Sequence, residues 1–214
     1  MKNANTVVYN RKIAVLGFRA VGKTSVTNAF VSGTFTDSYV SRTRRVEPTL
    51  LKVLTMGKTK QDPTIENTHH KTIRFRKVHF ATDILDTAGM DEYSSISRNA
   101  SVGIHGYVLV FSTASRSSLD NVIKINDALL DALGDASDVP RVLVGSMKDL
   151  VDEREVTYQQ AKTLADSWGI PYLESSSKTG ENVGEVFHQL LKEVERDNIL
   201  LKESEEDDCN CVIL

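Results

Sequence analysis

Cysteine is scarce in this sequence, and neither of the two cysteines lies where it could cross-link a folded core. Cys209 and Cys211 both stand within the last six residues, a distribution that suits a reducing cytosol. No apolar run approaches the length needed to span a bilayer, and the first ten residues lack the apolar stretch and cleavage site of a secretory signal. The five histidines have no cysteine partners at zinc-ligand spacing, which leaves them as ordinary surface or core residues.

What is present is the composition of one globular domain with an uneven charge. Hydrophobic residues make up 40% and charged residues 26% of the 214 positions, a length that suits a single α/β domain. Residues 40–61 carry six basic side chains against Glu47 alone, so this stretch has a local charge of +5 while the remainder carries −8. We predict an N-terminal extension over residues 1–10, a domain over residues 11–202 that includes the basic segment 40–61, and an acidic tail over residues 203–214.

Short apolar runs alternate along the chain with amphipathic ones, a pattern typical of strands and helices around a parallel sheet. Two expected strands, Thr72–Phe80 and Thr82–Asp86, are joined by a short turn and predict an antiparallel hairpin. The predicted fold is α/β: a mostly parallel six-stranded sheet with helices on both faces and this hairpin at one edge. The other expected strands are Ile13–Leu16, Tyr107–Phe111, Val142–Val144 and Pro171–Leu173, and the expected helices are Lys23–Phe30, Ser118–Leu133, Tyr158–Trp168 and Val183–Lys202.

A glycine-bounded turn between the first expected strand and helix fits the phosphate-loop pattern. Residues 17–24 are GFRAVGKT: glycine, four residues, glycine, lysine, then serine or threonine. Glycines let the backbone wrap a phosphate, whose oxygens are attracted by the amides and by the positive end of the following helix. Lys23 is placed to reach the β- and γ-phosphates, and the Thr24 hydroxyl to bind Mg²⁺. The motif predicts a P-loop NTPase but does not distinguish GTP from ATP.

The sequence DTAG at residues 86–89 follows another expected strand and complements the phosphate loop. The Asp86 carboxylate can hold magnesium through water, and the Gly89 amide can bind the γ-phosphate. In isolation, an aspartate that ends a strand is as readily a simple turn residue. The phosphate loop upstream favours the metal role.

Together with these motifs, residues 62–67 (DPTIEN), 86–93 (DTAGMDEY) and 174–178 (ESSSK) resemble the small GTPases of the Ras family. The resemblance is strongest to the Rheb branch, because Arg19 and the tract ESSSK are similar to its arginine and ESSAK. It runs from Arg11 to the C-terminus and is interrupted only by residues 40–61. The resemblance implies a Ras-like domain that binds GTP or GDP with Mg²⁺ and acts as a switch.

The resemblance also implies how the nucleotide is held. Thr64 would bind Mg²⁺ and the γ-phosphate, and Gly89 the γ-phosphate, so that hydrolysis releases both neighbouring segments. Phe35 would pack on the guanine ring, Asp149 would accept two hydrogen bonds from it, and Ser177 would donate its amide to the guanine carbonyl. Paired polar contacts of this kind reject adenine. The implied nucleotide site is Gly17, Arg19, Ala20, Val21, Gly22, Lys23, Thr24, Ser25, Phe35, Tyr39, Thr64, Asp86, Gly89, Ser146, Asp149, Ser177 and Lys178; the metal ligands are Thr24, Thr64 and, through water, Asp86; the effector segment is Asp62, Pro63, Thr64, Ile65, Glu66 and Asn67.

Met90 departs from the family pattern, because the family usually has there the glutamine that orients the attacking water. A thioether donates no hydrogen bond and accepts only weakly, so no catalytic side chain is assigned. Arg19 also crowds the γ-phosphate region. We predict slow intrinsic hydrolysis and a resting bias toward the GTP form.

The guanine-recognition motif departs as well. Residues 145–149 are GSMKD, whereas the family has asparagine and lysine at the positions of Ser146 and Met147. Serine is expected to be too short for the bridging contacts of asparagine, and methionine keeps the apolar stem without the ammonium. Because Asp149 is kept, we expect guanine specificity to survive, with lower affinity and faster exchange.

Residues 40–61 interrupt the first switch, because the Rheb branch has tyrosine and aspartate adjacent where this chain has Tyr39 and Asp62. One hypothesis is a basic loop that docks an acidic partner or anionic lipid. A second is a surface loop without function, since insertions there cost little closure entropy. A third is retained intron sequence: the segment begins Val-Ser, which GTAAGT can encode, ends in Gln, which CAG can encode, and preserves the reading frame. Sequencing transcripts across Tyr39 to Asp62 decides between them.

The last four residues, Cys211 to Leu214, are a cysteine, two aliphatic residues and leucine, a prenylation pattern that favours geranylgeranyl. A single lipid gives marginal attachment, and the acidic tail should repel anionic leaflets. Cys209 is either a palmitoylation site or a spare thiol. We expect loose binding to the cytoplasmic face of internal membranes, with a cytosolic pool.

The sequence therefore predicts a Rheb-like GTPase whose GTP form engages an effector, which the resemblance implies to be the TOR kinase complex of growth signalling. Its other expected partners are a GTPase-activating protein and a prenyltransferase; no nucleic-acid partner is expected, and the chain is expected to be a monomer. An alternative is a membrane-tethered pseudo-GTPase that binds nucleotide weakly and does not cycle, which Met90, Ser146 and Met147 favour. A third hypothesis, an ATP-dependent kinase, is disfavoured by Asp149, Ser177 and the prenylation pattern.

Overall fold

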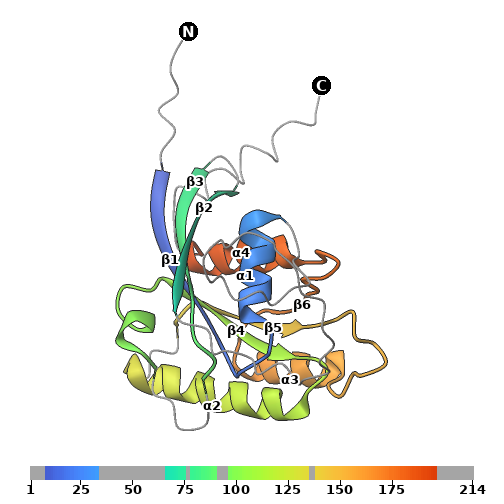
Figure 1. Cartoon of the computed structure of the whole chain (residues 1–214). Helices are drawn as coiled ribbons and strands as arrows, with labels where there is room; N and C mark the ends of the chain where they lie inside the picture. Colours follow the sequence, from blue (N-terminus) through green and yellow to red (C-terminus); the bar gives the residue numbers. More distant parts are fainter. Residues whose placement is uncertain (1–7, 34–65, 76–77, 91–95, 135–137, 197–214) are drawn as a thin grey trace, which may run out of the picture.

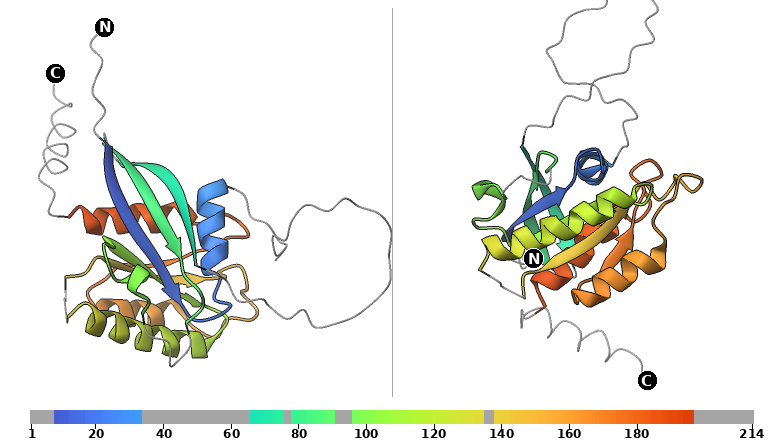
Figure 2. Two further views of the ribbon diagram at one scale, coloured as in Figure 1. Left: turned by 60° about the vertical axis from the view of Figure 1, so that its left-hand side comes forward. Right: turned by 90° about the horizontal axis from the view of Figure 1, so that it is seen from below.

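The structure is a computed structural model that describes residues 8–33, 66–75, 78–90, 96–134 and 138–196. It is a twisted sheet covered by helices on both faces (Figures 1 and 2). Within the described ranges, no helix has the length and apolar character required to cross a membrane. The elements in chain order are β1 (Val8–Gly17), α1 (Lys23–Ser32), β2 (Asn67–Phe75), β3 (Val78–Asp86), the short 3₁₀ helix η1 (Arg98–Ala100), β4 (Gly106–Ser112), α2 (Arg116–Ala132), β5 (Arg141–Ser146), α3 (Tyr158–Ser167), β6 (Tyr172–Glu174) and α4 (Val183–Val194).

The sheet has six strands in the order β2-β3-β1-β4-β5-β6. The β2–β3 pair is antiparallel at one edge, and every other pair is parallel, which confirms the predicted fold class. The parallel strands all end at the same side of the molecule. The loops that follow β1, β3, β4, β5 and β6 therefore gather at one edge, where doubly wound sheets bind their ligands.

Two hydrophobic layers hold the sheet between the helices. The side chains of Ile13 and Val15 point to the face covered by α1 and α4, whereas Ala14 and Leu16 point to the face covered by α2 and α3. Because both faces are covered, the central strands are continuous apolar runs, not alternating ones. β4, at the centre, is buried along its whole length.

Several predicted boundaries differ from the structure, three of them by several residues. β1 begins at Val8, inside the predicted extension 1–10. The hairpin reverses between Phe75 and Val78, within the predicted strand 72–80, because the apolar alternation changes phase there: Ile73 and Phe75 occupy odd positions, Phe80 and Ile84 even ones.

The last helix is the third difference. It was predicted to reach residue 202, but α4 ends at Val194. Glu195 caps the helix, and its buried carboxylate forms an ion pair with Arg11 of β1. This pair attaches the end of α4 to the sheet, a contact between distant residues that the apolar periodicity does not predict.

Candidate nucleotide-binding site

The loop after β1 folds as its glycines predict. Gly22 has a left-handed backbone with φ 87° and caps α1, which begins at Lys23. A Cβ atom on Gly17 would lie 2.3 Å from the carbonyl oxygen of Val110 in β4, so any side chain there would force the loop away from the sheet. Gly89 is equally constrained, because a Cβ atom on it would lie 2.8 Å from the Cα of Arg19. Both glycines are needed for close approach of two backbones.

Lys23 is buried at the centre of this loop, with only 6% of the residue exposed. Its ammonium donates hydrogen bonds to the carbonyl oxygens of Gly17 at 3.1 Å and Phe18 at 2.9 Å. Burial lowers the pKa of Lys23 to about 8, although the nearby Asp86 carboxylate opposes the shift. The ammonium is thus partly desolvated and lacks an anionic partner in direct contact among the described residues, which prepares it to receive a phosphate.

Asp86 and Thr24 form the second polar pair of the site. The Thr24 hydroxyl donates to Oδ2 of Asp86 at 2.7 Å. Asp86 is fully buried, and its Oδ1 has no hydrogen-bond partner within the described part of the chain. Burial raises the pKa of Asp86, opposed by the Thr24 hydrogen bond and by the charge of Lys23. An unpartnered carboxylate oxygen beside a hydroxyl is a donor set that suits Mg²⁺.

The segment after β3 is attached to the phosphate loop through its backbone. The Met90 amide donates to the carbonyl of Gly17 at 3.2 Å, and the Thr87 hydroxyl donates to the carbonyl of Val15 at 2.7 Å. The Met90 side chain is 7% exposed and packs into the hydrophobic layer with Leu16 and Leu85. The Met90 side chain is therefore part of the hydrophobic core and does not position the attacking water.

Ser146 corrects one expectation. It was expected to be too short to bridge to the phosphate loop, but its hydroxyl lies 2.5 Å from the carbonyl oxygen of Val21 and 2.9 Å from that of Phe111. The contact is possible because β5 runs immediately beside β4 and delivers a fully buried residue to the back of the loop. The bridge between the base-recognition motif and the phosphate loop therefore survives the loss of asparagine.

The recognition motif turns sharply after Ser146. Met147 has a left-handed backbone with φ 58°, and its sulfur accepts a hydrogen bond from the Ser112 hydroxyl at 3.3 Å. Asp149 is half-buried, and its Oδ1 accepts a hydrogen bond from the Ser176 hydroxyl at 2.6 Å. The expected loss of affinity and faster exchange now depend on the missing ammonium at Met147 alone.

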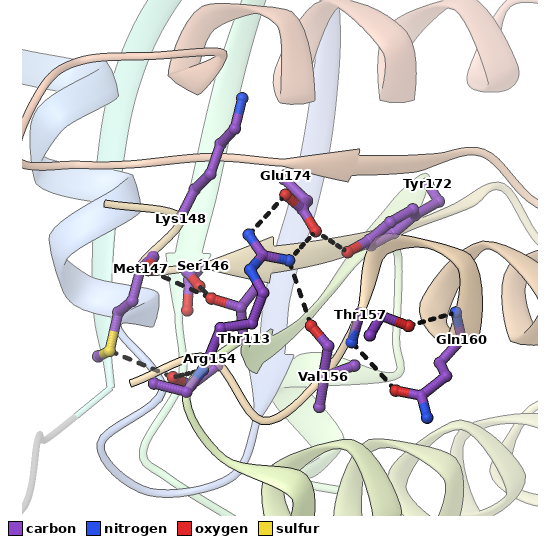
Figure 3. A network of polar contacts seen from close by, with 12 residues as sticks. Thr113, Ser146, Met147, Lys148, Arg154, Val156, Thr157, Gln160, Tyr172 and Glu174 are labelled. Atoms are coloured by element: carbon purple, nitrogen blue, oxygen red, sulfur yellow. Dashed lines mark hydrogen bonds and ion pairs between the residues drawn. The ribbon is translucent and has the colours of Figure 1, made fainter. Parts of the chain in front are cut away.

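Sequence reasoning did not single out three polar side chains that support these loops (Figure 3). The Thr113 hydroxyl lies within 3.0 Å of the carbonyl of Ser146 and 3.2 Å of that of Met147. Arg154 and Glu174 form a two-pronged ion pair behind the same loops. Glu174 belongs to the quoted tract ESSSK, which was a signal for its position but not for its partner.

The structure brings together the predicted residues of the phosphate loop, Asp86, Gly89 and the recognition motif at the carboxyl edge of the sheet. Ser177 and Lys178 follow β6 at the same edge. Glu66 of the effector segment accepts hydrogen bonds from the Ser97 hydroxyl at 2.8 Å and the Asn99 amide at 3.3 Å. Predicted site residues outside the described ranges are Phe35, Tyr39, Asp62, Pro63, Thr64, Ile65 and Cys211, as is the whole segment 40–61.

Comparison with known proteins agrees with this geometry. A sequence model of the Ras family matches residues 49–196. The chain is 43% identical over 187 residues to a GTP-binding protein Rheb homolog of Dictyostelium discoideum, covering 87% of this chain and 89% of that protein. It is 40% identical to GTP-binding protein rhb1 of Schizosaccharomyces pombe, covering 88% and 90% of the two chains, and 40% identical to GTP-binding protein Rheb of Homo sapiens, covering 87% and 89%.

The phosphate loop, the buried Asp86 and these similarities define the chain as a small GTPase of the Ras family, a GTP-binding GTP hydrolase. Within that family it belongs with the Rheb GTPases. The predicted family and enzyme class are thereby confirmed. Membership also removes the ATP-dependent kinase hypothesis.

Proposed function

We propose that this GTPase is a Rheb-like switch with slow intrinsic hydrolysis and a resting bias toward its GTP form. The observation that carries the proposal is Met90, which lies where the family usually has its water-orienting glutamine and which is packed into the core. Lys23, Thr24 and Asp86 support nucleotide binding, because they offer a buried ammonium to phosphate and oxygen ligands to Mg²⁺. The site thus retains its binding groups but lacks one side chain used in hydrolysis.

The cation would be held by the Thr24 hydroxyl, by Asp86 through water and by Thr64, and it would neutralise charge that develops on the phosphates. Gly89 and Thr64 would bind the γ-phosphate, so that hydrolysis would remove both anchors and release the two segments that carry them. The effector read by that form would be the TOR kinase complex, with residues 62–67 as its contact. A GTPase-activating protein would return the switch to GDP.

Replacing Met90 with glutamine tests this proposal. We expect Met90→Gln to raise the single-turnover rate of GTP hydrolysis roughly ten- to hundredfold, the effect of positioning a reactant correctly. The variant should also melt at a lower temperature, because the apolar layer loses the packing of the Met90 side chain when glutamine turns its amide toward the nucleotide. Single-turnover assays with Mg²⁺ and thermal melting measure the two effects.

Met90→Leu is the matched control, since leucine keeps the packing and cannot orient water. Its rate should equal that of the unaltered protein. The proposal is wrong if the unaltered protein hydrolyses GTP as fast as Ras proteins that carry the glutamine, or if the glutamine variant is no faster than the leucine variant.

A second candidate function is the non-cycling, membrane-tethered interaction module. The buried Met90 favours it, while the intact pairs at Lys23 and Thr24 argue against it. Membership of a family of GTP hydrolases also argues against it. The same single-turnover assay, repeated with an activating protein, distinguishes them: a module that does not cycle shows no turnover in either condition.

The proposed membrane anchor is a prenyl group on Cys211, attached by a prenyltransferase. We expect Cys211→Ser to move the protein wholly to the soluble fraction of fractionated cells. The variant cannot be prenylated, and even with one lipid the attachment is only marginal. Cys209→Ser, measured alongside, distinguishes the two hypotheses for Cys209: loss of a spare thiol leaves the membrane-bound protein in place, whereas loss of a palmitoylation site releases much of it. An unchanged distribution of the Cys211→Ser variant would show that another feature determines membrane binding.

A further inference from the structure

The residues that the family resemblance assigns to the guanine base come from two separate loops, whose relative position must be fixed for both to reach the base. One loop follows β5 and carries Asp149; the other follows β6 and carries Ser177. Three side-chain contacts join them: the Ser176–Asp149 hydrogen bond, the Lys148–Glu181 ion pair and the Arg154–Glu174 ion pair.

Of the two ion pairs among these contacts, Arg154–Glu174 is the better shielded from solvent. Nη1 and Nη2 of Arg154 donate to the two carboxylate oxygens of Glu174 at 2.7 and 2.9 Å. The Glu174 side chain is 7% exposed and that of Arg154 is 23% exposed. Arg154 also donates to the carbonyl of Val156 at 3.2 Å, and the Tyr172 hydroxyl donates to Glu174 at 2.9 Å. Planar two-pronged pairs of this kind fix orientation as well as distance.

The charge state of the pair is secured by these contacts. Burial alone would raise the pKa of Glu174, but the hydrogen bonds from Arg154 and Tyr172 outweigh burial and hold the pKa below its usual range. The hydrogen bond to Glu174 in turn raises the pKa of Arg154. Both partners therefore remain ionised at neutral pH. The Lys148–Glu181 pair is different, because its side chains are 34% and 48% exposed and salt screens exposed pairs.

Arg154 lies at the end of the first loop, just before the chain bonds again to Thr113, which follows β4. The amides of Glu155 and Val156 donate to the carbonyl of Thr113 at 3.0 Å, and the Thr113 hydroxyl reaches back to the carbonyls of Ser146 and Met147. The loop is thus closed on Thr113 at both of its ends (Figure 3). From this closed base, Arg154 crosses to Glu174, which immediately precedes the serines of the second loop.

We propose that Arg154 is a positioning residue for guanine recognition, which sets the distance between Asp149 and the loop of Ser177 and thereby the lifetime and selectivity of the bound nucleotide. The inference rests on the proposed contact of Asp149 with the base. It gives this chain a means of retaining nucleotide although Met147 lacks the ammonium of the usual lysine. Arg154 itself is engaged by Glu174 and Val156 and acts through the loops that it joins.

The test uses the full-length protein loaded with GDP, or with inosine diphosphate, whose base lacks the amino group that Asp149 is proposed to bind. We expect Arg154→Met and Glu174→Gln each to speed GDP release roughly ten- to hundredfold, because a displacement of about 1 Å costs that much in an aligned site. The preference for GDP over inosine diphosphate should fall at the same time. Arg154→Lys should recover only part of both effects, since lysine cannot form the two-pronged pair.

The matched control is Lys162→Met, which removes a cation from the exposed Lys162–Asp166 pair on α3 and should change neither release nor preference. Arg154 is merely structural if Arg154→Met lowers the melting temperature while the GDP-to-inosine preference stays unchanged, and that result overturns the proposal. Unchanged GDP release also overturns it. An Asp149→Asn variant, measured alongside, distinguishes failure of the positioning role of Arg154 from failure of the base contact of Asp149. If Asp149→Asn also leaves the preference for GDP unchanged, the proposed base contact itself is wrong.

Discussion

Asparagine in place of Asp149 should turn a guanine site into one that prefers xanthine. We expect Asp149→Asn to weaken GDP binding by roughly a thousandfold or more, since sites built to pair with a polar group lose that much when the pair is broken. The structure suggests how the new amide would lie. Oδ1 of Asp149 accepts a hydrogen bond from Ser176 at 2.6 Å, so the asparagine oxygen should keep this partner and turn its amino group toward the base.

An amino group donates where the carboxylate accepted, and xanthine carries an oxygen where guanine carries its amino group. Xanthosine diphosphate should therefore bind the variant more tightly than GDP does. Competition binding with both nucleotides measures the inversion. Asp152→Asn, an exposed change in the same loop, is the matched control and should leave both affinities as they were. Retention of GDP preference by the Asp149→Asn variant would remove Asp149 from the base contact.

Removing the Lys23 ammonium from the phosphate loop should have the second large effect on nucleotide binding. We expect Lys23→Met to reduce GTP affinity by roughly a hundredfold or more, because a charge-assisted contact to phosphate is lost in a buried, weakly screened site. The buried Lys23 ammonium bonds only to the carbonyl oxygens of Gly17 and Phe18 among the described residues. Lys192→Met on the exposed face of α4 is a control of equal charge change and should bind GTP normally.

The pH dependence of nucleotide binding should reflect the protonation of Lys23. Its pKa in the nucleotide-free protein is about 8, and a bound phosphate favours the protonated form. Nucleotide binding should take up a proton above pH 8, and affinity should fall there, while Lys23→Met should lose this slope. Calorimetry in buffers of different ionisation enthalpy measures the proton uptake.

The stability of the nucleotide-free protein should depend on pH in the opposite sense to nucleotide affinity. Between pH 8 and the ordinary lysine pKa of about 10.4, the folded state binds fewer protons at Lys23 than the unfolded state. The free energy of unfolding should therefore rise with pH in that window. A nucleotide affinity that stays constant from pH 7 to pH 10 would contradict the assigned environment of Lys23.

The parts of the fold and site that sequence could predict are those encoded by neighbouring residues. The phosphate loop is one continuous motif between an apolar strand and a helix, so the motif alone predicts the positions of Lys23 and Thr24 correctly. Thr24 and Asp86 were both assigned to magnesium from their motifs, and the structure brings them together because β3 and β1 are adjacent and parallel. The edge hairpin was also predicted, although its reversal point was misplaced.

The parts that sequence could not predict are contacts between distant segments. Ser146 was judged by the length of its side chain alone, whereas its contact with Val21 depends on how closely β5 approaches the loop. The partners Arg154 and Glu174 are separated by 20 residues and belong to no single motif. The burial of Met90 depends on η1 and the sheet packing around it, since Ala100 lies in the same hydrophobic layer.

The most direct measurement is guanine nucleotide binding by the purified protein in two forms, with and without residues 40–61, in the presence of Mg²⁺. The arrangement around Lys23, Thr24 and Asp86 predicts that the form lacking the segment holds one GDP or GTP per chain and does not exchange it for ATP. If neither form takes up guanine nucleotide, the buried ammonium and carboxylate at the carboxyl edge of the sheet are not a nucleotide site, and the switch mechanism fails with them.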